Sequence, residues 1–261
     1  MSQFDAAVTR VLITNDDGID APGLAVLEAV AATLAPEVWV VAPEHDQSGV
    51  SHSISLHAPL RIRRHGERRF GVTGTPADCI VVGLRQLMSV PPTLVLSGIN
   101  RGANLGIETV FSGTVGGAMA GLLLGVPSIA LSQSYTNHDA VRWDTAKQLA
   151  PGVIRKLLQT DWADAACLNV NFPDVPADSA GPLTVTRQGQ GLIKAVEVVT
   201  RIDPRGLDYS WLHITRGQQA DAMGSESQVI AAGGIAVTPL QFERTAEQVM
   251  SRLTADLANL P

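Results

Sequence analysis

Two adjacent carboxylates, Asp16 and Asp17, stand in the segment Asn15-Asp16-Asp17-Gly18-Ile19, where an apolar run ends and a helical pattern is about to begin. Held about 4 Å apart at an effective dielectric constant near 20, two such charges repel by roughly 4 kcal/mol, so they need a cation or a strong hydrogen-bond network. A divalent metal ion meets this need most simply. Both side chains can reach one ion only if the backbone turns after the strand, which Gly18 permits. The alternative is that the two acids only cap the helix and decorate a loop.

Two later loops carry polar side chains that can join this pair. The loop after the apolar run at 37–42 contains Ser48, and the glycine-rich loop after the run at 93–97 contains Asn100 and Asn104. Ligands of open parallel sheets bind beyond the carboxyl ends of the strands, so loops that follow strands can meet there. Carboxylate, hydroxyl and amide oxygens together form an all-oxygen set suited to Mg²⁺ or Mn²⁺.

The segment Ser112-Gly113-Thr114-Val115-Gly116-Gly117 leads into another helical pattern. Small residues at a helix N-terminus leave backbone N–H groups free to bind an anion, and the helix dipole favours negative charge there. The segment is not a Walker loop, since no lysine follows. Alone, such a start is usually an N-cap with a close helix–strand contact. Beside a hard-cation site, it predicts a phosphate cradle that includes the hydroxyls of Ser112 and Thr114.

The histidines show no ligand spacing such as HExxH, so none is predicted to bind a metal ion. His45 and His52 lie in or near the loop after the apolar run at 37–42 and are candidates for contact with substrate. The segment Gly74-Thr75-Pro76-Ala77-Asp78 predicts a turn and then a helix, with proline in the first turn and Asp78 complementing the dipole. Its functional use would be to support the site indirectly.

The elements that must position these side chains alternate through the first two thirds of the chain. Apolar runs lie near 10–15, 37–42, 93–97, 127–132 and 166–170. Helical patterns lie between them near 22–35, 76–89, 114–124 and 139–159. This alternation predicts βαβ units in an α/β fold with a doubly wound, mostly parallel sheet. Alternating residues between 51 and 72 indicate a small antiparallel excursion.

The pattern changes after about residue 180. Short β-like runs follow at 183–187, 195–201, 209–214 and 235–238, and a final helical stretch begins near 243. We interpret residues 1–180 as the catalytic core. Residues 181–261 are interpreted as a β-rich C-terminal arm with a terminal helix, outside the core sheet. Strand-like runs with few core partners of their own are commonly stabilised by exchange between protomers, so this arm is predicted to serve oligomerisation.

Composition sets the class of protein. With 261 residues, 45% hydrophobic and 17% charged, the chain is expected to be globular. A net charge of −6 argues against polymeric nucleic acid as a partner. The most apolar stretch, at 121–131, is short and broken by Gly125 and Pro127, and the start of the chain has no signal-peptide pattern, so we expect a cytoplasmic protein without a membrane partner. Cys79 and Cys167 have no CxxC partner and are predicted to be buried thiols.

Taken together and in order, these motifs resemble the stationary-phase survival protein SurE family of metal-dependent phosphatases. The resemblance is carried by ILITNDDGIDAPGL, APEHDQSGVSHSISL, GTPADC, SGINRGANLG and FSGTVGGAMAGLLLGVPSIALS, followed by the weaker LNVNFPD, DPRG and VTPL. These segments cover nearly the whole chain and are densest in its first half. One motif alone would be weak, but five in register are highly specific.

The resemblance implies a Rossmann-like core and a nucleotidase that hydrolyses nucleoside 5′- and 3′-monophosphates, often with activity on short polyphosphate. It also implies a homodimer or homotetramer formed by exchange of C-terminal segments. One Mg²⁺ or Mn²⁺ ion would be held by Asp16, Asp17, Ser48 and Asn100, of which the two aspartates would be catalytic. The phosphate site would be lined by Asn104, Ser112, Gly113 and Thr114.

The chain departs from the family's usual pattern at a few positions. Phe111 stands where tyrosine is usual, Ala120 where glutamate is frequent, Gly224-Ser225-Glu226 where Gly-Thr-Asp is common, and Gly234 where tyrosine is usual. None of these is a predicted metal ligand. They bear on substrate preference and assembly.

Two other functions stay open at this point. One is a phosphatase that prefers short-chain polyphosphate at the same site, and the other is a non-catalytic, metal-dependent nucleotide-binding sensor. A direct aspartate nucleophile, as in the haloacid-dehalogenase phosphatases, is disfavoured because their DxDx[TV] spacing is absent. Attack by water, with one carboxylate of the pair as base, is the favoured mechanism.

Overall fold

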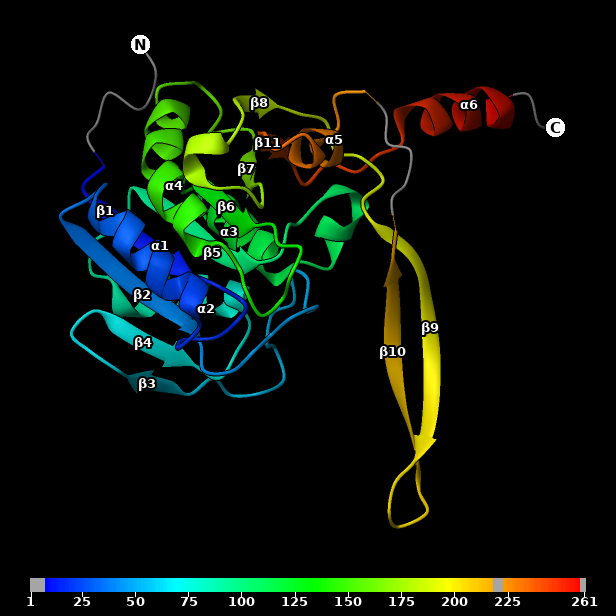
Figure 1. The fold of residues 1–261 in the computed structure, drawn as a ribbon, viewed down its shortest axis with the longest axis horizontal. Helices are drawn as coiled ribbons and strands as arrows, with labels where there is room; N and C mark the ends of the chain where they lie inside the picture. Colours follow the sequence, from blue (N-terminus) through cyan, green and yellow to red (C-terminus); the bar gives the residue numbers. More distant parts are fainter. Residues whose placement is uncertain (1–7, 218–222, 259–261) are drawn as a thin grey trace.

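A computed structural model describes residues 8–217 and 223–258. Its main sheet has nine strands in the order β3-β4-β2-β1-β5-β6-β7-β11-β8 (Figure 1). The central parallel strands are β1 (Arg10–Thr14), β2 (Glu37–Pro43), β5 (Leu94–Arg101), β6 (Ser128–Gln133) and β7 (Cys167–Phe172). The predicted α/β fold with a doubly wound, mostly parallel sheet is confirmed. The chain passes from β1 to β2 on one side and later to β5 on the other, so the strand order reverses between β1 and β5.

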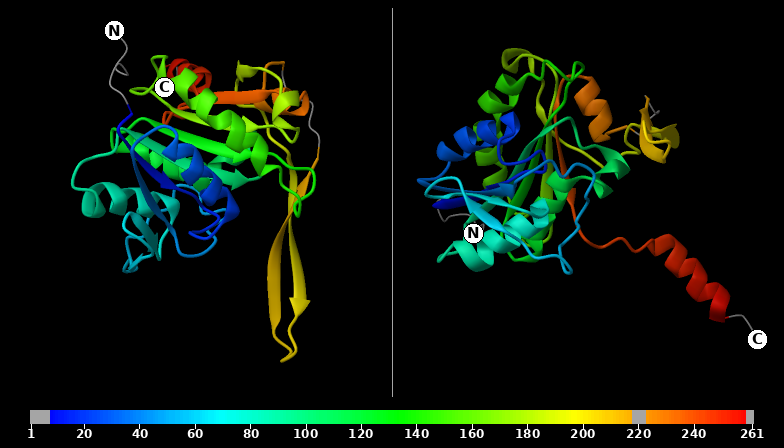
Figure 2. Two further views of the ribbon diagram at one scale, coloured as in Figure 1. Left: turned by 60° about the vertical axis from the view of Figure 1, so that its left-hand side comes forward. Right: turned by 90° about the horizontal axis from the view of Figure 1, so that it is seen from below.

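Helices cover both faces of this sheet (Figure 2). On one face lie α1 (Pro22–Ala32) and α4 (Trp143–Leu158), and on the other α2 (Pro76–Val82) and α3 (Gly113–Leu123). Strand β1 serves both layers because its side chains alternate. Val11 and Ile13 join the apolar cluster with residues of α1 and α4, whereas Leu12 joins the cluster with residues of α2.

Helix α1 approaches β5 closely. A Cβ at Gly23 would come within 1.9 Å of the carbonyl oxygen of Ile99, so only glycine fits at this position. Strand β5 has an irregular register against β6 between Ser97 and Asn100. The sequence pattern indicated a strand ending at residue 97, but β5 continues through this irregularity to Arg101. Asn100 therefore lies on the end of a strand rather than in a free loop.

The region between β2 and β5 contains the expected antiparallel excursion. Strand β3 (Ile62–Arg64) pairs antiparallel with β4 (Arg69–Val72), which joins the main sheet parallel to β2. The helix expected over 76–89 is regular only as far as α2, and a π-helical turn, η1 (Gly83–Leu87), follows it. Two short 3₁₀ helices, η2 (Gly106–Val110) and η3 (Ala177–Ser179), complete the connections.

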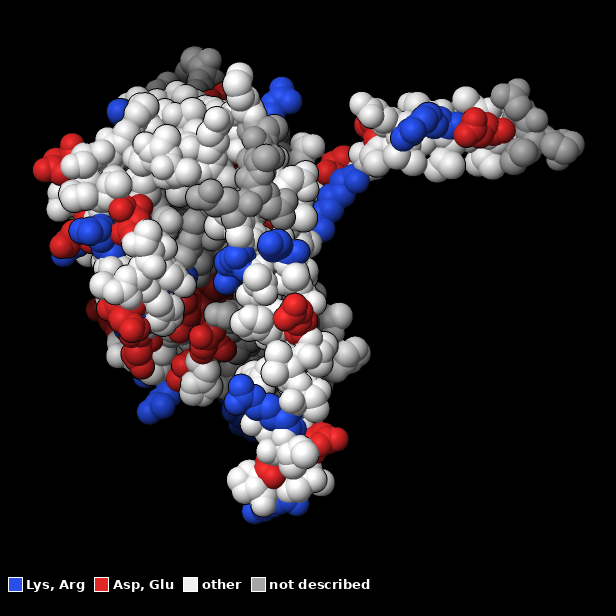
Figure 3. Space-filling view, turned by 45° about the vertical axis from the view of Figure 1, so that its right-hand side comes forward, with Lys and Arg blue, Asp and Glu red and all other residues white. Residues whose placement is uncertain are grey.

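The segment after residue 180 divides into two parts. The expectation that it lies outside the core sheet is wrong for β8 (Leu183–Val185) and β11 (Ile235–Leu240), because β11 pairs with β7 and β8 pairs with β11. Strands β9 (Ile193–Ile202) and β10 (Asp208–Arg216) form a separate hairpin. Helix α5 (Glu226–Ala231) packs near β11, and α6 (Glu247–Ala258) follows it. The hairpin and α6 reach away from the body, with white, uncharged surface between their charged side chains (Figure 3).

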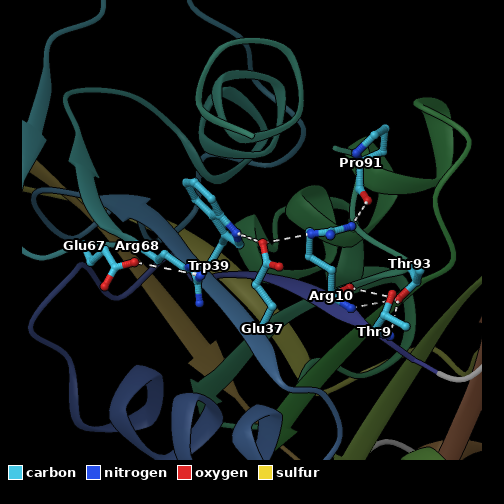
Figure 4. A network of polar contacts seen from close by, with 8 residues as sticks. All are labelled: Thr9, Arg10, Glu37, Trp39, Glu67, Arg68, Pro91 and Thr93. Carbon is cyan, nitrogen blue, oxygen red and sulfur yellow. Dashed lines mark hydrogen bonds and ion pairs between the residues drawn. The ribbon is translucent and has the colours of Figure 1, made fainter. Parts of the chain in front are cut away.

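A polar network fixes the amino edge of the sheet, opposite the loops that carry the candidate site (Figure 4). The Glu37 carboxylate accepts from Arg10 Nε at 2.9 Å and from Trp39 Nε1 at 2.7 Å. Arg10 also donates to the carbonyl oxygen of Pro91 at 3.1 Å, and the Thr93 hydroxyl donates to the Arg10 carbonyl at 3.0 Å. These bonds connect the starts of β1, β2 and β5, so this polar cluster has a structural role.

The two cysteines are buried and free, as predicted. Burial raises the pKa of the Cys167 thiol to about 12, and burial also raises the pKa of Cys79. Within the two described ranges, no helix has the length and apolar character needed to cross a membrane.

Candidate metal and phosphate site

Four chain segments meet where the strand order reverses. They are the turns after β1 and β2, the end of β5 and the start of α3. The backbone oxygen of Asp16 accepts from Gln47 N at 2.7 Å, and the Asp17 carboxylate accepts from Arg101 N at 3.2 Å. The Asp16 carboxylate accepts from the hydroxyl of Thr114. These contacts place Asp16 and Asp17 beside the residues that neighbour Ser48 and Asn100, and beside the start of α3.

Asp16 is a nearly buried carboxylate, with 5% of its surface exposed. Burial raises its pKa to about 6, and the charge of Asp17 adds to the rise, while hydrogen bonds from the hydroxyl and backbone of Thr114 oppose it. The start of α3 also touches this side chain, since a Cβ at Gly113 would lie 2.7 Å from the Asp16 Cβ. Asp16 therefore connects the end of β1 to the N-terminus of α3.

Asp17 is half-buried on the other side of the turn. Burial raises its pKa, the nearby Asp46 carboxylate adds to the rise, and the backbone N–H and the charge of Arg101 lower it. Gly18 adopts φ = +103°, and the Asn15 side chain donates to its carbonyl oxygen at 2.9 Å. Gly18 thus provides the backbone turn that the sequence required between the two carboxylates and α1.

Asp16→Asn is expected to stabilise the metal-free protein, and more so as the pH rises. The folded-state pKa of Asp16 is raised from 3.8 to about 6, so the folded state holds a proton that the unfolded state releases. The free energy of unfolding therefore falls between about pH 4 and pH 6, by at most about 3 kcal/mol. Asparagine removes this loss, and its side-chain oxygen can still accept from Thr114.

Urea unfolding with chelator present, at pH 4.5 and pH 7.5, measures this effect. The exposed acid of the same loop gives the matched control, Asp20→Asn, which should leave the difference between the two pH values unchanged. An Asp16→Asn protein destabilised equally at both pH values would contradict the expectation.

Ser48 and Asn100 flank the aspartates on neighbouring loops. Ser48 is exposed, and its backbone N–H donates to Asp46 Oδ1 at 2.7 Å, which shapes the turn after β2. Asn100 is half-buried, and its Nδ2 donates to the Gly102 carbonyl at 2.8 Å, so Oδ1 is the group it offers as an acceptor. Both residues present an oxygen suited to a hard cation.

The start of α3 is built as an N-terminal anion site would be. Ser112 is the N-cap, and its hydroxyl accepts from Val115 N at 3.0 Å, so this hydroxyl is already used within the helix. The Thr114 hydroxyl is directed to Asp16. Phosphate contacts from this segment would therefore come mainly from its backbone N–H groups.

Asn104 lies in the loop between β5 and η2. It is held by residues that the sequence did not single out. Its backbone N–H donates to Asn171 Oδ1 at 2.8 Å, and its Nδ2 donates to Ser132 Oγ at 2.9 Å. Asn169 and Asn171 both donate to the Asn104 carbonyl, at 2.8 and 3.1 Å. The sequence held one signal for this role. Asn169 and Asn171 are two residues apart at the end of an apolar run, so both side chains share one face of the predicted strand.

The segment at 74–79 supports the loop that follows Ser48. Thr75 and Asp78 form a capping box at the start of α2, as the sequence indicated for a helix start. Asp78 also accepts from the backbone N–H and the hydroxyl of Ser55, at 2.9 and 2.7 Å. Thr75 donates its hydroxyl to the Ser53 carbonyl at 2.6 Å. These bonds tie residues 53–55 to α2.

Among the described residues, no histidine side chain forms a hydrogen bond with Asp16 or Asp17, although the backbone of His45 lies against Gly18. Among the residues that the structure describes, no group of three or more His, Cys, Asp or Glu side chains is arranged to hold a metal ion. A set with two aspartates, one serine and one asparagine does not depend on such a group. His52 instead lines a pocket of about 450 Å³ on the flank of α3, together with Val115, Met119 and Arg244. Neither Asp16 nor Asp17 lines this pocket.

Comparisons with known proteins give one consistent result. The family model described as "Survival protein SurE" matches residues 11–195. The chain is 57% identical over 249 residues to "5'-nucleotidase SurE 1" of Burkholderia lata, covering 95% of this chain and 96% of that protein. It is 47% identical over 253 residues to "5'-nucleotidase SurE" of Beijerinckia indica, with coverage of 95% and 96%. A solved SurE protein from Aquifex aeolicus superimposes with a TM-score of 0.80 at 35% identity, covering 94% of this chain and 98% of that one.

Proposed function

This chain belongs to the survival protein SurE family, and on that premise we propose that it is a divalent-metal-dependent 5′-nucleotidase. It would be a phosphoric monoester hydrolase that releases phosphate from nucleoside 5′- and 3′-monophosphates. We infer this activity from the relatives, which are named as 5′-nucleotidases. The observation in this chain that best supports it is the Asp16–Asp17 pair, which lies against the N-terminus of α3 where the strand order reverses.

The donor groups fit one Mg²⁺ or Mn²⁺ ion. Both aspartates have raised pKa values, and no Lys or Arg side chain among the described residues forms an ion pair with either of them. The charge of Arg101 acts on Asp17 without a direct ion pair, and burial still raises the pKa of both acids. Two adjacent carboxylates in this state carry negative charge that a divalent ion would neutralise. We propose Asp16, Asp17, Ser48 and Asn100 as its ligands. Bound there, the ion would supply positive charge for a phosphate oxygen and lower the pKa of a water molecule.

The residues of the chain itself would perform the other steps. The backbone N–H group of Gly113 at the start of α3 would bind an equatorial phosphate oxygen and stabilise the charge that develops on it, since the N–H of Thr114 already donates to Asp16. Thr114 would hold Asp16 in place through the hydrogen bond already made. One carboxylate of the pair would accept the proton of the attacking water.

The two alternatives share this site but differ in product. A polyphosphate-preferring phosphatase would release phosphate faster from short polyphosphate than from any nucleotide. A nucleotide sensor would bind nucleotide without releasing phosphate. Nothing in the arrangement of Asp16, Asp17 and α3 favours either alternative over the nucleotidase named for the relatives.

The deciding experiment measures phosphate release from a panel of 5′- and 3′-nucleoside monophosphates and from short polyphosphate. Each substrate is assayed after chelation and after adding back Mg²⁺ or Mn²⁺. We expect release from nucleotides that stops with chelator and returns with the ion. If calorimetry detected nucleotide binding but no phosphate were released, the protein would be a nucleotide sensor and not a hydrolase.

We further propose that the chain is a homodimer or homotetramer assembled through the β9–β10 hairpin and α6. Both elements expose large apolar side chains. On the hairpin, Trp211 is 65% exposed and Leu212 is 73% exposed, and on α6 Leu257 is 63% exposed. Apolar surface of this kind on elements that reach away from the body is typical of protein–protein contact.

Replacing residues 195–214 with a short turn is expected to reduce the oligomer size while the secondary structure of the body stays intact. In the described part of the chain, strands β9 and β10 pair only with each other, so the main sheet loses no strand. Light scattering after size exclusion, with circular dichroism, measures both effects. A chain ending near residue 180 is a poorer test, because it also removes β11 from the sheet and should aggregate. Full-length protein that is already a monomer at micromolar concentration would refute the proposal.

A further inference from the structure

The hairpin is joined to the body through one side chain in particular, Glu108 of η2. The Glu108 carboxylate accepts from the backbone N–H of Leu192 and, at 2.9 Å, from that of Ile193, where β9 begins. Its second oxygen lies 3.8 Å from Arg216 Nε, where β10 ends. Strand β9 thus begins, and strand β10 ends, at the same carboxylate, whereas the extensive contacts of the two strands are with each other.

Glu108 sits in the middle of the segment that carries the proposed phosphate residues. It lies four residues after Asn104 and four before Ser112, in the turn that sets the spacing between them. Only 13% of its side chain is exposed, whereas 61% of the Arg216 side chain is exposed. A largely buried carboxylate that accepts two backbone N–H groups makes strong, charge-assisted bonds, while the exposed ion pair adds little.

Close packing reinforces this junction. Gly191 adopts φ = +80°, and a Cβ there would lie 2.7 Å from Glu108 Oε1. Gln188 donates its Nε2 to the Gly106 carbonyl at 2.9 Å and to the Thr109 hydroxyl at 2.7 Å. Residues 188–193 therefore lie directly on η2, and a change in the direction of the hairpin has to move η2 or break these bonds.

We propose that Glu108 is a positioning residue that couples the β9–β10 hairpin to the substrate-binding segment 104–112. Contacts made by the hairpin would set the position of Asn104, which precedes η2, and so the affinity for the phosphate group. This inference rests on the proposed function, because it assigns substrate binding to that segment. It predicts an effect on KM larger than that on kcat, since the carboxylate pair is not displaced.

Steady-state kinetics on AMP with Mn²⁺ tests the coupling in three variants. Glu108→Ala is expected to raise KM about fivefold or more, with a smaller change in kcat. Glu108→Gln keeps a side-chain oxygen as acceptor and should fall between wild type and Glu108→Ala. Glu197→Gln removes an exposed acid of the hairpin that faces His213 and should behave as wild type. Hydrogen exchange should become faster at 104–112 and 192–193 in Glu108→Ala, but not in β1 or α1.

A double-mutant cycle makes the test specific. Replacing residues 195–214 with a short turn should change KM in the wild-type background and have no further effect in the Glu108→Ala background. Additive effects would overturn the coupling, as would faster exchange at 104–112 with an unchanged KM. The dissociation constant of AMP, measured by calorimetry, separates this inference from the proposed function. A wild-type protein that binds AMP without releasing phosphate refutes the hydrolase, and the same cycle is then measured on the dissociation constant.

Discussion

Asp17→Asn is expected to lower phosphate release by more than about 10²-fold while the fold stays intact, and Asp16→Asn should do the same. Removing a residue that only supports a metal ligand typically costs 10- to 100-fold, so removing a proposed ligand should cost more. Both side chains lie in a turn between β1 and α1, and neither forms an ion pair with a Lys or Arg side chain in the described part of the chain. The loss should therefore come from the ion and not from unfolding.

Phosphate release and the affinity for Mn²⁺, measured by calorimetry, test this expectation together. Asp20→Asn changes an exposed acid of the same loop and should retain activity. Wild-type turnover by the Asp16→Asn, Asp17→Asn double variant would disprove the assignment. Full activity in excess chelator would be equally damaging, because it would remove the need for an ion.

Thr114→Val is expected to reduce kcat by up to about 10²-fold, the upper end of the usual cost of removing a residue that supports a metal ligand. The Thr114 hydroxyl donates to the buried Asp16 carboxylate, and valine leaves that carboxylate without this donor. The sequence indicated a phosphate contact for the Thr114 hydroxyl, whereas in the structure this hydroxyl holds the proposed metal ligand Asp16. The pKa of Asp16 should rise further, so the pH at which Mn²⁺ begins to bind should also rise.

Thr145→Val is the matched control for this variant. Thr145 is likewise a buried threonine in the first turn of a helix, and its hydroxyl donates to the Val175 carbonyl at 2.6 Å, on α4 and away from the carboxylate pair. Both variants should lose some stability, measured by urea unfolding, but only Thr114→Val should lose activity. If Thr114→Val left both kcat and KM unchanged, the hydroxyl would have only a packing role.

The central sheet could be predicted from the sequence because each parallel strand is an apolar run bounded by turn residues and followed by a helical pattern. The candidate ligands followed from the same logic, since loops after parallel strands share one edge. The placement of β8 and β11 could not be predicted in this way. A short strand looks the same in an arm as at the edge of a sheet, and β11 joins antiparallel to β7 from far along the chain.

Contacts between side chains that are distant in the sequence also could not be predicted. The spacing in Ser112-Gly113-Thr114 indicates a helix start, but it does not show that the Thr114 hydroxyl faces Asp16, 98 residues earlier. Asn169 and Asn171 similarly acquire a role only when β7 is placed beside the loop that contains Asn104. Periodicity fixes the face of an element, whereas its partner depends on the tertiary arrangement.

The position of β11 in the sheet has a consequence for how the protein is made. Strand β11 lies between β7 and β8, yet about 70 residues separate the end of β7 from the end of β11. At a translation rate of about 5–20 residues per second, the outer edge of β7 waits roughly 4–14 s on the ribosome for its partner. Strand β8, although synthesised earlier, has no place to pair until then. The nascent chain thus carries an open sheet edge while the residues between β7 and the end of β11 are synthesised, the interval in which chaperones would protect it most.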